Sequence, residues 1–192
     1  NGGANVYATT HTGSTVSVTG TITAGNLTVG TGTITVNNIV NGGANATGNI
    51  GSSTTYFNTA FVKATSAQYA DLAEKYVADA AYEPGTVVVF GGDKEVTVSS
   101  TSPDARVAGV VSTNPSYIMN STLEGEYVAT IALTGRVPTK VSGPVTKGDM
   151  MVSAGNGRAI ACATPTMGTV IGKALENHTD GNGVIEVVVG RL

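Results

Sequence analysis

The chain has 192 residues, enough for one large domain or two small ones, and a formal net charge of −3. This charge excludes the strongly basic surface that attracts nucleic acid or acidic membranes, and without a run of about 18 apolar residues we expect no membrane insertion. The single cysteine, Cys162, excludes an internal disulfide framework and a cysteine-based metal cage.

The composition favours a mainly β fold. Glycine contributes 26 residues, tryptophan is absent, and only 12% of the residues are charged, which is typical of β-rich, turn-rich proteins. A soluble enzyme of this size normally carries more charge and more histidine. Because the sequence begins with Asn1 and shows no signal peptide, we expect it to be a fragment, a processed form or the ordered part of a longer chain.

Residues 1–62 contain no Lys, Arg, Asp or Glu, and their apolar side chains alternate with Thr and Ser. The motif TGTIT at 19–23 recurs at 31–35, and the period of two predicts short strands with one apolar face each. One such chain has too few large apolar residues for a core. We therefore expect a β-prism-like or β-helix-like shaft in which several chains share a core, with a disordered low-complexity linker as the alternative. The residues expected at the shared interface are Val16, Val18, Ile22, Ile34 and Val36.

The segment 63–82 is predicted to be a junction helix between this shaft and a C-terminal domain at 83–192. Either Thr65 and Gln68 form a capping box or Ser66 is the N-cap, and an apolar stripe at helical spacing follows. A helix of about three turns is marginal alone, so it must dock on the C-terminal domain or on the same helix of other chains. The stripe residues expected at the oligomer interface are Tyr69, Leu72 and Tyr76.

Residues 83–192 are predicted to form a compact β-barrel or β-sandwich head, because many short strands follow one another between turn signals. Strands are expected at 86–90, 95–98, 107–111, 127–133, 136–141, 150–152, 158–161, 169–175 and 184–189. The longer break at 112–126 is either a surface crossover or a binding loop. Within it, Tyr117 and Met119 are the candidate receptor contacts.

Two stretches carry a resemblance to known proteins. The sequence IGSSTTYFNTAF at 50–61 resembles a unit of bacteriophage tail fibres that precedes their C-terminal module. The series from YADLAEKY through PGTVVVFGG and RVAGVVSTNP to GVIEVVVG, roughly residues 69–190, is similar to the C-terminal domain of phage tail-fibre and tail-spike proteins. The same module closes some large secreted surface proteins of bacteria. Members of this family trimerise, act as intramolecular chaperones for the upstream shaft, and in some cases cleave themselves off.

The resemblance implies a structural virion component that forms a homotrimer, caps the fibre and contacts the host surface. Its partners would be itself, other virion tail or fibre proteins, and a glycan or protein of the host cell surface. It would be made in the host cytoplasm and act on the virion outside the cell. Two alternatives stay open: a self-cleaving intramolecular-chaperone endopeptidase, and a bacterial cell-surface adhesin.

No catalytic, cofactor-binding or metal-binding residue can be assigned from a motif, and we expect no cofactor. His11 and His178 are isolated, without clustered carboxylates or cysteines beside them. Autoproteolysis needs a positioned nucleophile and a group that takes its proton, so a nucleophile within hydrogen-bond reach of a carboxylate would favour it. Candidates without a diagnostic motif are Thr65, Ser66, Asp71, Glu74, Asn120 and Ser121.

Overall fold

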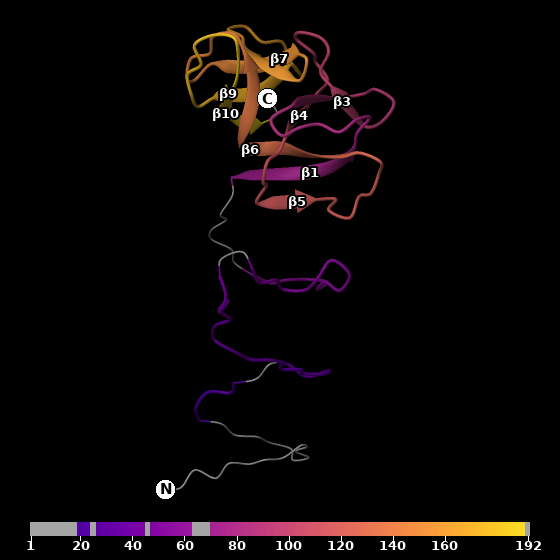
Figure 1. Ribbon diagram of the computed structural model, residues 1–192, viewed down its shortest axis with the longest axis vertical. Helices are drawn as coiled ribbons and strands as arrows, with labels where there is room; N and C mark the ends of the chain where they lie inside the picture. The colour runs from indigo at the N-terminus through magenta and orange to yellow at the C-terminus, as the bar shows by residue number, and fades with distance from the viewer. Residues whose placement is uncertain (1–18, 24–25, 45–46, 63–69, 191–192) are drawn as a thin grey trace. The chain divides into compact units, whose positions relative to one another are not determined.

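The computed structural model describes residues 19–23, 26–44, 47–62 and 70–190 (Figure 1). The chain divides into two compact units, Asn1–Ala60 and Phe61–Leu192. The second unit is called the head below.

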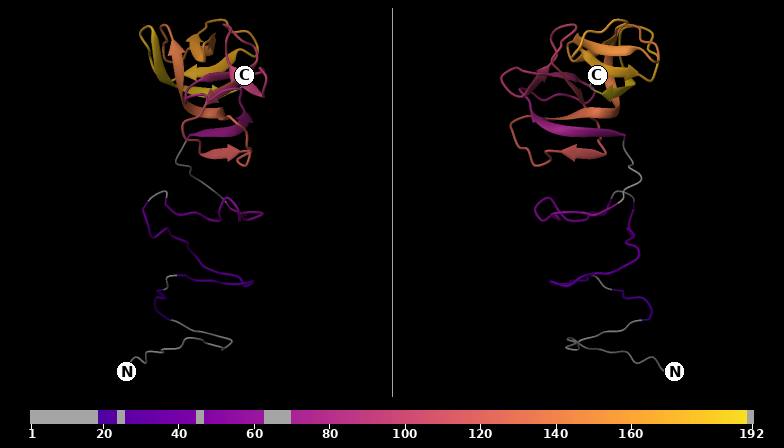
Figure 2. Two further views of the ribbon diagram at one scale, coloured as in Figure 1. Left: turned by 45° about the vertical axis from the view of Figure 1, so that its right-hand side comes forward. Right: turned by 180° about the vertical axis from the view of Figure 1, so that it is seen from behind.

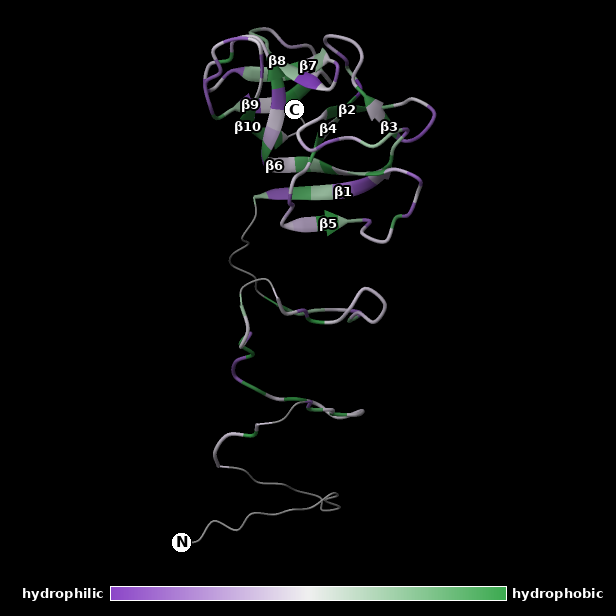
Figure 3. Ribbon diagram, viewed as in Figure 1, coloured by the Kyte–Doolittle hydropathy of each residue, from purple (hydrophilic) through white to green (hydrophobic). Residues whose placement is uncertain are grey.

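In the first unit, the described residues between 19 and 60 contain neither strand nor helix. Their hydrogen bonds are local: the Asn41 side chain accepts from the Gly43 N–H at 2.9 Å, and Ser52 Oγ accepts from the Thr55 N–H at 2.9 Å. Hydrophobic residues recur along this part of the chain (Figure 3), and Ile22, Ile34 and Val36 are more than half exposed. A single copy therefore makes no core here, and the strands of a multi-chain shaft stay a prediction.

Residues 70–190 of the head contain strands and loops but no helix, which confirms the predicted mainly β fold. The ten strands are β1 (Asp71–Val77), β2 (Val87–Phe90), β3 (Val96–Val98), β4 (Val107–Val111), β5 (Tyr117–Met119), β6 (Val128–Ser142), β7 (Met150–Gly155), β8 (Arg158–Ala161), β9 (Val170–Ala174) and β10 (Asn182–Gly190).

Five of these strands close into a small barrel in the order β10–β9–β7–β8–β6, because β6 also pairs with β10. The closing pair is antiparallel and long, running from Asn182↔Ser142 to Gly190↔Thr134. Valine, isoleucine and alanine side chains from these strands, together with Met151, fill the interior. Closure removes the free edges that a five-stranded open sheet would expose. Figure 2 shows the yellow strands of the barrel in the upper part of the head, away from the purple strand β1, whereas β6 lies beside β1.

The remaining strands extend from β6, the longest strand. On one side β4, β2 and β3 continue the sheet and enclose a second core around Val88, Val96 and Ile131. β1 also pairs with β6, antiparallel, and carries the short parallel strand β5 at its other edge. The first strand of the head, β1, is thus part of its sheet.

The predicted junction helix is wrong where the structure describes it, because Asp71–Val77 is strand β1. Asp71 and Ala73 are buried while Leu72 between them is only partly covered, which is strand alternation rather than a helical stripe. Pairing with β6 along the whole segment outweighs the local helix preference. The capping-box residues and Tyr69 lie outside the described residues.

Most predicted strands of the head are present, with shifted ends. The two strands predicted at 127–133 and 136–141 are one strand, β6, which passes through Gly135 at φ +117° without turning. The break at 112–126 is a crossover that contains β5. The strands predicted at 86–90 and 95–98 are β2 and β3, which pair as an antiparallel hairpin.

Candidate functional site

A polar cleft of about 230 Å³ lies where the first residues of β1 meet the end of β4, the middle of β6 and the outward side of β10. Four segments far apart in the sequence contribute to it. Its ionisable side chains are Asp71, Arg136 and Glu186, and Ser112 supplies a hydroxyl.

The centre of this cleft is a hydrogen bond between a serine and a carboxylate. Ser112 Oγ donates to Asp71 Oδ2 at 2.6 Å, and the two residues are only 7% and 5% exposed. A carboxylate this deeply buried needs such a donor to offset its lost hydration. The bond also joins the first residue of β1 to the residue that follows β4.

The backbone beside this pair is held by further donors. The Asp71 carbonyl oxygen accepts from the Ser116 N–H at 2.9 Å and from Ser116 Oγ at 2.8 Å. The Ala70 carbonyl oxygen accepts from the Arg136 N–H at 3.2 Å. Two donors on one carbonyl oxygen polarise the Asp71–Leu72 peptide bond and would stabilise negative charge that develops on that oxygen.

The close approach of β1 to β6 in the cleft depends on Gly135. A Cβ at this position would lie 2.1 Å from the Ala70 carbonyl oxygen and 2.6 Å from Asp71 Cα. Its φ of +117° is also a conformation that side chains of L-residues rarely adopt. Glycine here is what lets the Ala70–Asp71 backbone lie against β6.

A second carboxylate, Glu186, lies at the rim. Partial burial, the nearby charge of Glu176 and that of Asp71 raise the pKa of Glu186, and the Arg136 guanidinium opposes this rise. The cleft therefore combines one hydroxyl, two carboxylates of different environment and one guanidinium. Within the described lining, the carboxylate of Asp71 is the group placed to take a proton from Ser112.

The residues predicted from the sequence for the oligomer interface are found in different places. Val16, Val18 and Tyr69 fall outside the described residues. Leu72 is partly exposed, and Tyr76 packs on the second core with its ring 5.7 Å from that of Phe90, edge to face. Whether these side chains touch other chains stays a prediction.

The two predicted receptor contacts lie on β5. Tyr117 is 63% exposed and is the register partner of Leu72, and Met119 is the register partner of Glu74. The structure thus brings a predicted receptor contact next to a predicted interface residue. Their role in receptor contact stays a prediction.

Sequence reasoning selected Asp71 but missed Ser112. The only signal for Ser112 was its position directly after the apolar run of β4, where a hydroxyl is unremarkable. Pairing it with Asp71 required knowing that β1 and β4 both lie along β6. Of the other candidates, Glu74 accepts from the Tyr76 hydroxyl at 2.7 Å and Asn120 donates to the Lys75 carbonyl at 3.3 Å, while Thr65 and Ser66 lie outside the described residues.

Metal ligands do not gather in the part of the chain that the structure describes: no three of its His, Cys, Asp and Glu residues form a group that could hold an ion. In the same residues, no helix has the length and apolarity to cross a membrane.

Comparisons with known proteins give matches in structure only. No protein-family model matches the chain, and neither does any curated protein. A crystal structure of the pre-mature gene product 12 of bacteriophage phi29 aligns with 69% of this chain at 13% identity and a TM-score of 0.51. A second, the N base of the head fiber gp8.5 of the same phage, aligns with 62% of this chain and 94% of its own at 14% identity, with a TM-score of 0.39. The matched part spans 23% of gene product 12, and this likeness shows that the chain shares a fold with part of that phage protein.

Proposed function

We propose that this chain is a structural component of a phage virion, the C-terminal part of a tail fibre or spike that trimerises and caps the fibre. The fold shared with part of phi29 gene product 12 supports the phage assignment. The observation that carries the assembly is the exposed apolar surface of the first unit.

That surface is large for a single chain. Ile39 and Val40 are each 82% exposed and Ile50 is 85% exposed, in a segment without one charged side chain. Water-exposed apolar residues without neighbouring charge favour association, because burial removes them from water. Three copies wrapped about one axis would pair the backbone groups and give these side chains a common core.

In this proposal the head caps the shaft, associates with other virion tail or fibre proteins, and presents β5 to the host surface. Tyr117 supports the last point, because an exposed aromatic ring with a hydroxyl suits contact with a glycan or a protein. The protein would be made in the host cytoplasm and act on the extracellular virion.

Light scattering of the full chain tests the assembly. We expect a mass of about three times the 19.2 kDa of one chain, because the first unit has no core of its own among its described residues. A mass near that of one chain would sink the proposal.

A second function, self-cleavage, is favoured by the Ser112–Asp71 pair. In this proposal Ser112 Oγ attacks the carbonyl carbon of a peptide bond near residues 60–70, and the Asp71 carboxylate accepts the hydroxyl proton. The proton passes to the leaving amine, and water then hydrolyses the ester and frees Ser112. The hydrogen bond of 2.6 Å between the hydroxyl and the carboxylate supports this role, because it places the base on the proton of the nucleophile.

Mass spectrometry of the purified full-length protein tests self-cleavage. We expect two fragments from the native chain and a single intact species from Ser112→Ala. Ser112→Thr should stay intact or be cleaved slowly. Ser100→Ala is the matched control, since it removes an exposed hydroxyl that does not line the cleft and leaves the Ser112–Asp71 bond. An intact native chain after long incubation rules the activity out.

A further inference from the structure

We define the outer face as the outward side of three barrel strands. These are β10, β9 and the part of β6 that pairs with β10, residues 134–142. Along β10 the inward side chains Ile185, Val187 and Val189 are at most 4% exposed. On the opposite side of the strand, Val184 and Val188 point outward and are 59% and 43% exposed, with the half-buried Glu186 between them. Exposed valines on the outward side of a paired strand, rather than at a loop tip, are typical of a surface that another protein covers.

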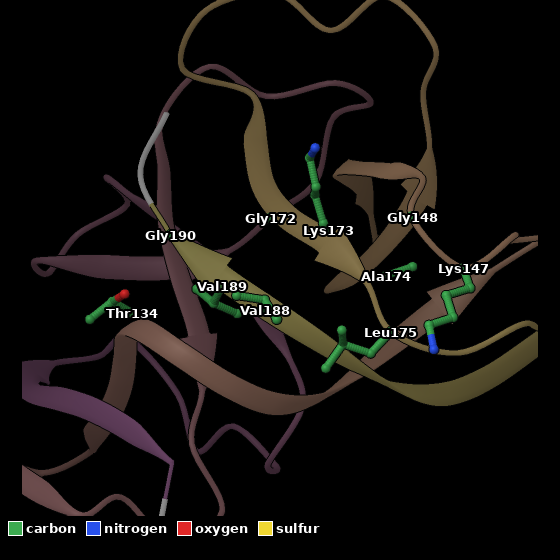
Figure 4. A pocket seen from close by; sticks show the side chains of 10 residues that line it. All are labelled: Thr134, Lys147, Gly148, Gly172, Lys173, Ala174, Leu175, Val188, Val189 and Gly190. Carbon is green, nitrogen blue, oxygen red and sulfur yellow. The ribbon is translucent and has the colours of Figure 1, made fainter.

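Cations flank this apolar pair. Val188 is the register partner of Lys173 in β9 and of Arg136 in β6, and both of these side chains are exposed. Beside them is an open groove of about 560 Å³, where Lys147 and the apolar side chain of Leu175 join Val188 (Figure 4). The outer face therefore carries two exposed valines and the cations Arg136, Lys147 and Lys173, against the two carboxylates Glu176 and Glu186. Cations outnumber carboxylates there, so a partner surface with excess negative charge suits it.

The same head carries a surface of the opposite sign, the acidic end. It consists of exposed side chains near the end of β1, with five carboxylates and one cation: Asp79, Asp93, Glu95, Glu124, Glu126 and Lys94. Glu95 Oε2 accepts from the Val77 N–H at 2.7 Å, the Asp79 N–H donates to the Val96 carbonyl at 3.3 Å, and Gly125 lies against the Val77 side chain. These contacts fix carboxylates from three segments around one strand end.

The separation of charge within the head is pronounced. Residues 70–126 hold nine Asp and Glu against three Lys and Arg, a net −6, whereas residues 127–190 hold four against five, a net +1. Figure 1 shows β9 and β10 on one side of the head and β3, beside the end of β1, on the other. One copy therefore presents two different surfaces of opposite excess charge.

A three-fold assembly requires two unlike, complementary surfaces on each copy, because each contact in a ring joins different surfaces of neighbouring copies. We infer that the outer face of one copy receives the acidic end of a second copy of this chain, and that the contact repeats to close a trimer of heads. This inference rests on the proposed trimer and names the surfaces that form it. Opposite charges steer the two surfaces together, and burial of Val184 and Val188 supplies the apolar part of the contact.

Zero-length carbodiimide cross-linking of the full chain tests the contact, because it joins only lysine and carboxylate groups that touch. We expect covalent dimers and trimers on a denaturing gel. Peptides from the dimer band, absent from the monomer band, should link Lys173 or Lys147 to a carboxylate of the acidic end. In Val188→Glu these links should fall at least tenfold, because the new carboxylate sits at the centre of the contact and repels the acidic end.

A second test variant and a matched control accompany Val188→Glu. Lys173→Glu changes an exposed side chain and should lower the links of Lys147 by a similar factor without risk to the barrel core. Met167→Glu is the matched control, since it adds the same charge at a residue that is 92% exposed and lies outside the outer face, and its links should equal those of the native chain. Circular dichroism of each variant verifies folding.

The outcomes separate the two proposals. A native chain that is monomeric by light scattering contradicts the proposed function. Two outcomes contradict only this inference: a trimer without cross-links at the outer face, and cross-links that persist unchanged in Val188→Glu and Lys173→Glu. The outer face would then be a surface for another virion protein.

Discussion

At the scale of single residues, a few buried polar groups stabilise the head, because each of them is hydrogen-bonded. Asp104, only 4% exposed, accepts from Arg106 Nε at 3.0 Å and from Nη2 at 2.7 Å, and Thr101 Oγ1 adds a third donor. The Ser153 hydroxyl accepts from the Asp104 N–H at 2.7 Å and so joins this loop to β7 of the barrel. The Arg106 hydrogen bonds are the largest cause that lowers the pKa of Asp104 to about 2.

This carboxylate makes the stability of the head depend on pH. The pKa is lowered in the folded state, so the stabilisation is complete above the unfolded value near 3.8 and is lost as the pH falls toward 2. We expect Asp104→Asn to lower the free energy of unfolding by about 1–2 kcal/mol at pH 7, a figure reduced because Arg106 is half exposed.

Urea denaturation between pH 7 and pH 2 measures this effect. The difference between the native chain and Asp104→Asn should shrink as the pH drops below about 4. Glu83→Gln, an exposed carboxylate between β1 and β2 that lies outside the acidic end, serves as the control and should change stability little at any pH. A difference that stays constant down to pH 2 would show that the Asp104 carboxylate is not held as described.

At the scale of elements, β6 organises the head, because it belongs to the barrel, borders the second core and carries β1. The contact of β1 with β6 passes over Gly135. We expect Gly135→Ala to lower the free energy of unfolding by about 3 kcal/mol or more, from the clash with the Ala70 carbonyl and the strain of a positive φ together.

Gly143→Ala separates these two causes. Gly143 has φ +76° but nothing lies within 4 Å of the position of its Cβ, so only the backbone strain of about 1 kcal/mol remains. Chemical denaturation of both variants should rank Gly135→Ala as clearly the worse. Equal losses would mean that β1 does not lie against β6 as closely as described.

The same strand shows where sequence reasoning reaches its limit. The strands at Val107–Val111 and Arg158–Ala161 could be placed from local signals, since apolar β-branched runs end at turns. Asp71–Val77 could not, because its residues favour a helix locally and its strand form depends on β6, more than fifty positions away. The Ser112–Asp71 pair was hidden for the same reason, as it exists only once β1 and β4 are both paired with β6.

At the scale of the whole molecule, the chargeless first unit and the charged head pose different folding problems. The head buries its apolar residues within one chain, in two clusters. The described part of the first unit does not, and Ile34 remains 57% exposed. The proposed assembly solves this by giving alternate residues to a core shared between copies.

This alternation gives a paired test. We expect Ile34→Asp to weaken the trimer strongly, because three carboxylates would enter one apolar core. Thr35→Asp, one position along the chain, should leave the trimer intact, because its side chain would point to water. Light scattering across a dilution series measures both, and equal behaviour of the two variants would contradict an alternating shaft.

The pairing of β6 also determines how close the start of the first strand of the head lies to the end of its last strand. Strand β1 begins at Asp71, which pairs with Gly135, and strand β10 ends at Gly190, which pairs with Thr134. Both strand ends therefore lie beside two consecutive residues of β6. Across two strand spacings they are on the order of 10 Å apart. A short linker of a few residues could span that gap, so the head has the geometry of a cassette, one that tolerates circular permutation or insertion into a foreign loop.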